Sequence, residues 1–271
     1  MSLVPFTKFV NDAAGLEKTL RGLQGMTQLA ASFFAGYEMI EYLAMSEVIR
    51  KHFALGRRYF RFFKFIDCVV ASADALQGDE NGGPEGVLGA LNAVRWQFLG
   101  LYILTEAFTI LDAMGLRRSS WAPFIFVESM RFWFYSICCT IVLLSVDLYN
   151  IRRQIVTLQQ RLAVHQASAA NSGTCVQATG PTKTKELTIT DKKDSPVLKY
   201  DEVFLKTKEG LRTAKQQQQL LLQRIVGSFC DLLTPGPVIG AIDVGPAVVA
   251  STSILSSVLA GREIWKKVNG R

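Results

Sequence analysis

The sequence predicts an all-α protein: a membrane-associated bundle of amphipathic and hydrophobic helices with a disordered linker. Apolar residues recur at helical spacing near the N-terminus, a basic and aromatic stretch follows, and long uncharged apolar runs come later. Hydrophobic residues make up 49% of the chain although 20% is charged, and the mean hydropathy is +0.21. We expect a helical membrane region at 1–165, a linker at 166–199 and a C-terminal helix with a membrane anchor at 200–271.

The first predicted helix begins at Asn11 or Asp12, either of which is a suitable N-cap. Apolar residues from Leu16 to Phe34 then recur at the spacing of one helix face. Gly36 is expected to break this helix. A second helix then leads into the basic stretch.

The stretch Val48–Ala75 is the most distinctive part of the sequence. Between Val48 and Ile66 it carries six basic residues and no acidic residue. We treat it as one helix, with about 100° between successive residues. Most of the basic side chains then share a narrow face, and most of the aromatic side chains share the broader opposite face.

A wide aromatic face beside a dense cationic face suits the plane where acyl chains meet anionic headgroups. The alternative is a surface helix that packs on its own protein. We expect the basic face to bind headgroups, and we assign to it Arg50, Arg57, Arg58, Arg61 and Lys64. We expect the apolar face to insert into the membrane, and we assign to it Phe53, Tyr59, Phe60, Phe62, Phe63 and Ile66.

Two hydrophobic regions follow a predicted loop at 76–89. The first starts near Leu91 and is expected to end at Gly115, but Glu106 and Asp112 interrupt it, so it does not predict a clean membrane span. The second, at 132–146, has fifteen uncharged residues. Such a helix covers about 22 Å and is short for a bilayer core of about 30 Å. Deep insertion or burial in protein is equally compatible with it.

The segment 166–199 is rich in small and polar residues, so we expect disorder. A polar helix is predicted at 200–223, and prolines and glycines make 235–240 irregular. Val244–Gly261 then has eighteen uncharged residues, enough for about 27 Å of helix. Its serines favour contact between helices. We expect a membrane span here, with a buried or hairpin segment as the alternative.

Net charge and sequence motifs narrow the possible functions. The net charge of +7 favours an anionic partner, and the long apolar runs favour an anionic phospholipid membrane over nucleic acid. The five cysteines form no disulfide framework, and His52 and His165 are far apart, so we expect no metal site. No P-loop or GxSxG motif occurs in the sequence. We therefore expect no enzyme activity, no catalytic residues and no cofactor.

Several short motifs, taken in order, resemble the peroxin-eleven family. They are Phe9, Gly15, Lys18, Arg21 and Gln24; Phe53-Ala54-Leu55-Gly56-Arg57; Tyr102 and Glu106; Arg131-Phe132-Trp133; Asp147-Leu148-Tyr149; and Cys230-Asp231-Leu232-Leu233. Each motif is weak, and their order over nearly the whole chain is what makes the resemblance specific.

The resemblance implies a protein of the peroxisomal membrane that elongates it during proliferation and fission. It also implies a homo-oligomer and recruitment of the fission machinery. For some members it implies a pore, so the alternative function is a channel for small metabolites across the peroxisomal membrane. Glu106, Asp112 and the serines in 251–257 would then line the channel.

Overall fold

The computed structural model describes residues 3–77, 86–173 and 196–270. Within these ranges every regular element is a helix, which confirms the predicted all-α fold. The predicted linker at 166–199 falls mainly on 174–195, which lies outside the described residues. Its flanks are helical, because one helix continues to Gly173 and the next begins at Pro196. Most of the loop predicted at 76–89 likewise lies outside the described residues.

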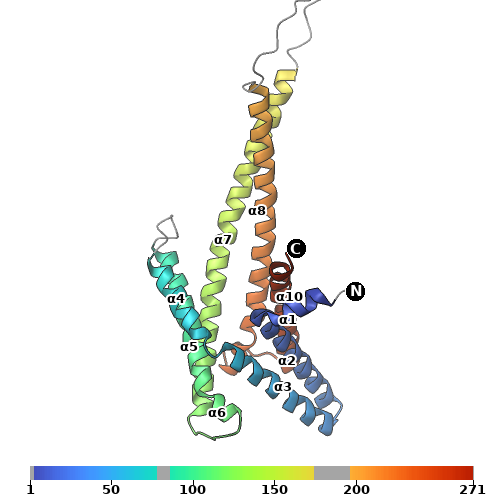
Figure 1. Ribbon diagram of the computed structural model, residues 1–271, viewed down its shortest axis with the longest axis vertical. Coiled ribbons are helices and arrows are strands. Elements are labelled where there is room, and N and C mark those ends of the chain that lie inside the picture. Colours follow the sequence, from blue (N-terminus) through green and yellow to red (C-terminus); the bar gives the residue numbers. More distant parts are fainter. Residues whose placement is uncertain (1–2, 78–85, 174–195, 271) are drawn as a thin grey trace, which may run out of the picture. The chain divides into compact units, whose positions relative to one another are not determined.

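The chain divides into two compact units, one made of 1–145 with 223–271 and the other of 146–222. The helices, labelled in Figure 1, are α1 (Val4–Asn11), α2 (Ala13–Gly36), α3 (Ile40–Arg61), α4 (Lys64–Gln77), α5 (Val87–Phe108), α6 (Ile110–Ala113), α7 (Ala122–Gly173), α8 (Pro196–Leu232), α9 (Pro235–Val238) and α10 (Pro246–Asn269).

Asp12 separates α1 from α2 and caps α2. Its extended backbone stops α1, and its carboxylate accepts a hydrogen bond of 3.1 Å from the backbone N–H of Gly15. The predicted cap is therefore confirmed, and so is the end of the helix at Gly36. Helix α1 was not predicted. It begins with Pro5 in its first turn, where the missing N–H of proline costs nothing.

The prediction of one continuous helix over 48–75 is wrong. The chain turns at Phe62 and Phe63, and hydrogen bonds that span three residues replace the helical pattern there. The two halves pack on different partners: α3 lies against α2, and α4 lies against α5. On α4, Ser72 donates a hydrogen bond of 3.3 Å to the carbonyl oxygen of Ala93 on α5. The turn lets each half bury its own contact face.

Helices α4 and α5 and the first turns of α7 enclose a small core of Cys68, Tyr102, Ile103 and Met130. Gly115 ends the α5–α6 region with a left-handed φ of 75°, as the sequence predicted. The apolar run 132–146 is part of α7, which is far longer than that run. The unit 146–222 contains the remainder of α7 and most of α8, and buries Ile155 and Ala214.

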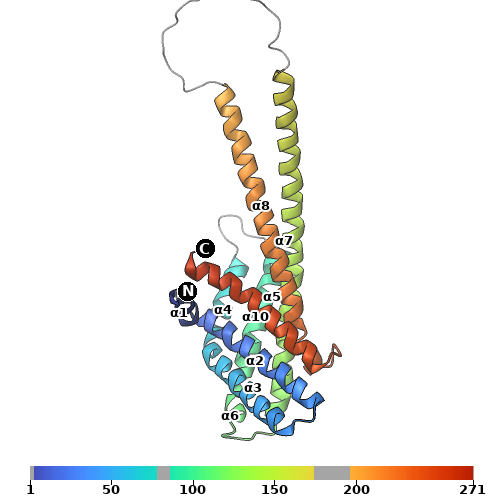
Figure 2. The same cartoon turned by 90° about the vertical axis from the view of Figure 1, so that its right-hand side faces the viewer.

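Helix α10 packs along α2, as both orientations of the ribbon show (Figure 1, Figure 2). Small residues form this contact, where Ser257 faces Gly22; Ser253, Ser256 and Ser257 of α10 are all buried, and Ser256 binds Asp231 at the end of α8. The predicted role of serines in helix contact is confirmed for these three positions. Gly25 on α2 is where the helices come closest, since a Cβ there would lie 2.8 Å from Ile254 Cγ1 and 3.3 Å from the carbonyl oxygen of Ala250.

We expect Gly25→Ala to destabilise the protein by about 1–3 kcal/mol, because the added methyl group overpacks the α2–α10 contact. Gly22→Ala is the matched control. It lies on the same helix, and its Cβ would meet only Ser257 Cβ at 3.8 Å. Thermal unfolding of the purified protein in detergent measures the difference. Equal melting temperatures for the two variants would contradict the close helix contact.

Candidate membrane interface

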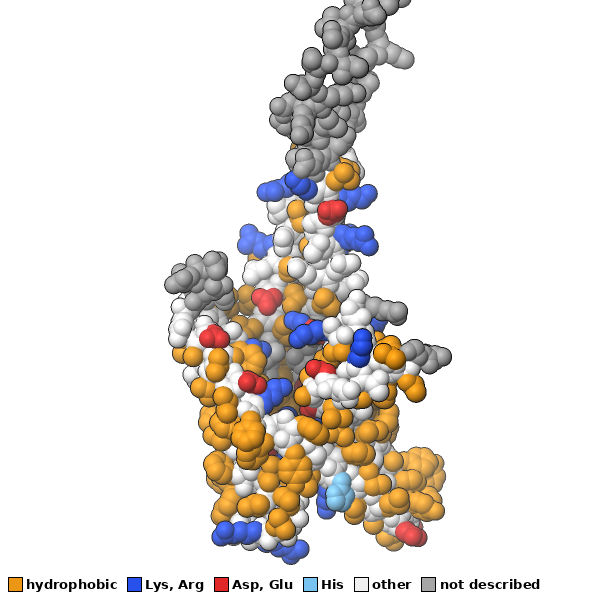
Figure 3. All heavy atoms as spheres, in the orientation of Figure 1, with side chains coloured by type: hydrophobic (Ala, Val, Ile, Leu, Met, Phe, Trp, Pro, Cys, Tyr) orange, Lys and Arg blue, Asp and Glu red, His pale blue; other side chains and the backbone are white. Residues whose placement is uncertain are grey.

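The aromatic side chains predicted to insert into the membrane lie on the surface, around the turn between α3 and α4. Tyr59, Phe60, Phe62, Phe63 and Ile66 are exposed, by 37% to 70%, and we call them the aromatic ridge. Phe53, the remaining predicted member, is half-buried. Figure 3 shows hydrophobic side chains over much of the surface of α4 and α5 and of α2 and α3. Such a large exposed apolar surface is typical of a membrane or protein contact.

The arginines of the same stretch lie on the inner side of α3. Arg57 is 8% exposed and packs against α2. Its Nε and Nη2 donate hydrogen bonds of 3.1 Å and 3.0 Å to Glu17 Oε1, and its Nη1 donates one of 2.7 Å to Gln24 Oε1. A paired guanidinium is the form in which an arginine is tolerated inside a helix bundle.

Arg58 and Arg61 share the carboxylate of Glu106 on α5. Arg61 Nη2 lies 2.8 Å from Glu106 Oε2, and Arg58 Nε lies 3.3 Å from Oε1. The Nη1 of Arg61 also donates a hydrogen bond of 3.0 Å to the Tyr102 hydroxyl oxygen. These contacts tie the end of α3 to α5.

A third pair joins α2 to the end of α8. Arg21 Nη2 lies 2.5 Å from Asp231 Oδ1, and the Ser256 hydroxyl donates to the same oxygen. We call these three groups of paired charges together the ion-pair network; its members are Glu17, Arg21, Arg57, Arg58, Arg61, Glu106 and Asp231.

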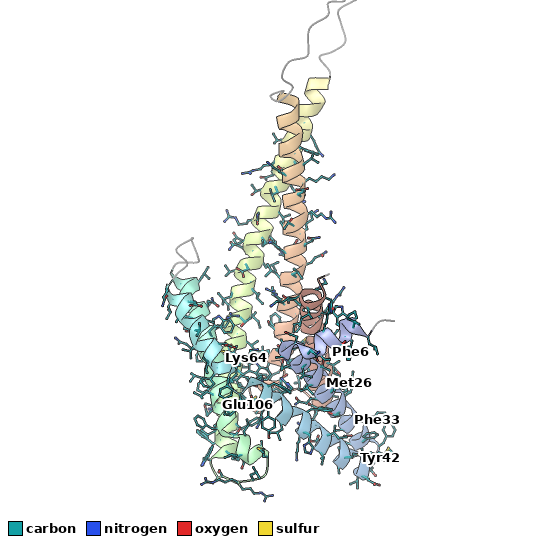
Figure 4. All side chains as sticks on the ribbon, viewed as in Figure 1. Phe6, Met26, Phe33, Tyr42, Lys64 and Glu106 are labelled. Atoms are coloured by element: carbon teal, nitrogen blue, oxygen red, sulfur yellow. The ribbon has the colours of Figure 1, made fainter. Side chains whose placement is uncertain are left out.

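The two other predicted basic residues lie nearer the surface. Arg50 pairs with Glu47 on its own helix at 2.6 Å, with 30% of its side chain exposed. Lys64 is exposed at the start of α4, and Figure 4 labels it together with Glu106. Headgroup binding by the five predicted residues stays a prediction. For Arg57 and Arg61 it requires that their close pairs with Glu17 and Glu106 open.

Sequence reasoning missed the carboxylates that compensate the basic stretch. The segment 48–66 contains no acidic residue, and Glu17 and Glu106 lie 40 and 45 residues from their partners Arg57 and Arg61. One signal was available: each carboxylate interrupts a largely apolar helix. An acid in such a position needs a partner when the helix packs.

Burial and neighbouring charges shift the pKa of Glu17 and of Arg57. Burial alone would raise the pKa of Glu17, but the neighbouring charges of Lys18, Arg57 and Arg61 outweigh it and hold the pKa below the ordinary value. Burial lowers the pKa of Arg57 to about 10, with a further contribution from the like charge of Arg61. Both groups are charged at neutral pH.

In the part of the chain that the structure describes, three helices are long and apolar enough to cross a membrane, judged by length and composition: Val87–Phe108, Ala122–Val164 and Pro246–Asn269. The last contains the predicted span Val244–Gly261 almost entirely. The first qualifies although the sequence did not predict a clean span there. The second qualifies because α7 continues well beyond the short run at 132–146. Among the described residues, no group of three or more His, Cys, Asp or Glu could hold a metal ion.

We expect Glu106→Gln to lower the free energy of unfolding by about 3–5 kcal/mol, because two guanidinium groups lose a buried carboxylate. Glu47→Gln is the control, since Glu47 pairs with Arg50 on α3, outside the candidate spans, where 30% of the arginine side chain is exposed. That pair should contribute less than about 1 kcal/mol. Denaturant unfolding in detergent measures both; a similar small loss for each would contradict the network.

We also expect the contribution of Glu17 to depend on pH. Its pKa is lowered in the folded state, so the stabilisation is complete above the ordinary value of 4.5 and declines as the pH falls below it. The stability difference between the wild type and Glu17→Gln should therefore be largest at pH 7 and shrink by pH 3. A difference that stays constant over this range would contradict the lowered pKa.

Comparison with known families gives one match. The family model described as Peroxisomal biogenesis factor 11 (PEX11) matches residues 3–265, nearly the whole chain. Comparison with curated proteins and comparison with solved structures give no match. The family is one of peroxisome biogenesis factors rather than enzymes. Its function and the three apolar helices place the protein at the peroxisomal membrane. The chain belongs to the Peroxisomal biogenesis factor 11 family.

Proposed function

We propose that the protein remodels and elongates the peroxisomal membrane during peroxisome proliferation and fission. The aromatic ridge would insert into the cytosolic leaflet. Insertion of side chains into one leaflet enlarges that leaflet relative to the other and favours curvature. The observation that carries the proposal is the exposure of the ridge, in which Phe63 is 70% exposed, at the end of a helix whose Arg57 and Arg61 are paired inside.

The arrangement of charges supports insertion of the ridge. Aromatic side chains gain by burial in lipid, whereas an unpaired arginine beside them would resist it. Here Arg57 and Arg61 are neutralised by Glu17 and Glu106 before the ridge meets the membrane. Lys64 remains at the surface, next to Phe63, to bind an anionic headgroup.

The metabolite channel is the other candidate that the sequence raised. Its expected lining residues make internal contacts: Glu106 pairs with Arg61, Asp112 accepts a hydrogen bond of 3.1 Å from the Ser119 N–H, and Ser256 binds Asp231. These contacts favour membrane remodelling over a channel.

Self-association and recruitment of the fission machinery belong to the same proposal. Many copies would concentrate ridges on one patch of membrane, and curvature would increase with their density. The fission machinery would then act on the narrowed membrane.

We expect Phe60→Ser, Phe63→Ser and Ile66→Ser together to abolish tubulation of anionic vesicles by the full-length protein. Each change removes about 1.5–3 kcal/mol of apolar burial in lipid. The matched control replaces three exposed leucines of α8, which is not among the candidate spans: Leu205→Ser, Leu220→Ser and Leu222→Ser. Electron microscopy of the vesicles measures tubule length. Unchanged tubulation by the ridge variant, or equal loss in the control, would contradict the proposal.

A further inference from the structure

A cavity of about 500 Å³ lies inside the unit 1–145 with 223–271, among α2, α3, α5, α7 and α10. Its size suits a phospholipid headgroup or another small ligand. Its walls are uneven in charge: the only carboxylate among its described lining residues is Glu106, whereas six cations line it. These are Arg21, Arg50, Lys51, Arg57, Arg58 and Arg61.

The carboxylates around the cavity do not balance these cations. Three carboxylates each pair with one lining arginine: Glu17, Glu47 and Asp231. The carboxylate of Glu106 pairs with two arginines. Glu106 binds Arg61 closely, so its contact with Arg58 is the longer one, at 3.3 Å. Arg58 also donates a hydrogen bond to an uncharged group, from its Nη1 to Thr109 Oγ1 at 3.4 Å. Lys51 has no carboxylate partner among the described residues and is exposed. An excess of positive charge in a partly enclosed space favours an anion.

Two further observations point to a ligand that has both an anionic and an apolar part. Thr234 Oγ1 is buried, lines the cavity and makes no hydrogen bond within the described structure, although buried hydroxyl groups normally have a partner. Phe126, Met130 and Trp133 of α7 form an apolar wall, together with Val249 of α10. Both helices are among the candidate membrane spans.

We propose that the cavity binds the phosphate of an anionic phospholipid, with Arg58 and Lys51 supplying the charge that the carboxylates leave unbalanced. The phosphate oxygens accept hydrogen bonds from these side chains, and the Thr234 hydroxyl donates another. The start of the acyl chains lies along Phe126 and Trp133. The apolar wall favours a lipid phosphate over free phosphate. This site is separate from the aromatic ridge and goes beyond the proposed remodelling function.

Equilibrium binding to the full-length protein in a neutral detergent tests the proposal. Trp133 in the cavity wall reports binding by its fluorescence, and Trp133→Phe identifies the part of the signal that comes from the cavity. The probes are dihexanoyl phosphatidic acid, dihexanoyl phosphatidylcholine and inorganic phosphate. No vesicle is present, so the result is independent of whether the protein deforms membranes.

We expect phosphatidic acid to bind at least about tenfold more tightly than phosphatidylcholine. We expect Lys51→Gln with Arg58→Gln to weaken phosphatidic acid binding by at least about tenfold. The charge-matched control is Arg117→Gln with Arg118→Gln, at two exposed positions outside the cavity lining, and should leave binding unchanged. Lys51→Gln alone changes only an exposed side chain, so it tests the proposal even if the double variant misfolds. We expect it to weaken phosphatidic acid binding, by less than the double variant does.

Equal binding of the two lipids would overturn the proposal. Unchanged phosphatidic acid binding by the folded double variant, or by the folded Lys51→Gln variant, would overturn it too. Inorganic phosphate that binds as tightly as phosphatidic acid would overturn the assignment to a lipid, because the apolar wall would then contribute nothing.

Discussion

The pairing of the α3 arginines with carboxylates of α2 and α5 decides how the rest of this fold is arranged. A guanidinium in a helix bundle is stable only when a partner neutralises it, so α3 must turn its basic side toward Glu17 and Glu106. These pairs connect segments that are 40 and 45 residues apart, and they fix the rotation of α3 about its own axis. Once that rotation is fixed, the side chains on the other face of α3 must lie outside.

The exposed aromatic ridge follows from this rotation. In a water-soluble helix bundle the rings would be inside and the arginines outside; here both positions are reversed. The turn at Phe62 and Phe63 continues the ridge from α3 to α4, because α4 packs on α5 through Cys68 and Ser72 and leaves Ile66 exposed. The same rotation also explains the cationic cavity, since arginines that face inward outnumber the carboxylates available to them. One constraint thus connects the surface proposed to meet lipid and the site proposed to bind a single lipid.

Much of the local structure could be predicted from the sequence. Helical periodicity gives α2 and α10, the short polar side chain of Asp12 gives a cap, and Gly115 gives a left-handed helix end. The periodicity also places Arg57 and Arg61 on one face, and they do share one. The direction of that face could not be predicted, because it depends on Glu17 and Glu106, which only the tertiary fold brings close. The turn at Phe62 could not be predicted either, since it arises from the separate partners of α3 and α4.

The orientation of α3 in a bilayer is the most direct test of this account. Spin labels at Phe63→Cys on the ridge and at Ser46→Cys, a buried position of α3 outside the cavity lining, are introduced into a cysteine-free protein in anionic liposomes. Relaxation by oxygen reports contact with lipid, and relaxation by a soluble nickel complex reports contact with water. The account predicts strong relaxation by oxygen at position 63 and weak relaxation by both agents at position 46. A label at position 63 that only the nickel complex reaches, or one at position 46 that lies in lipid, would contradict it.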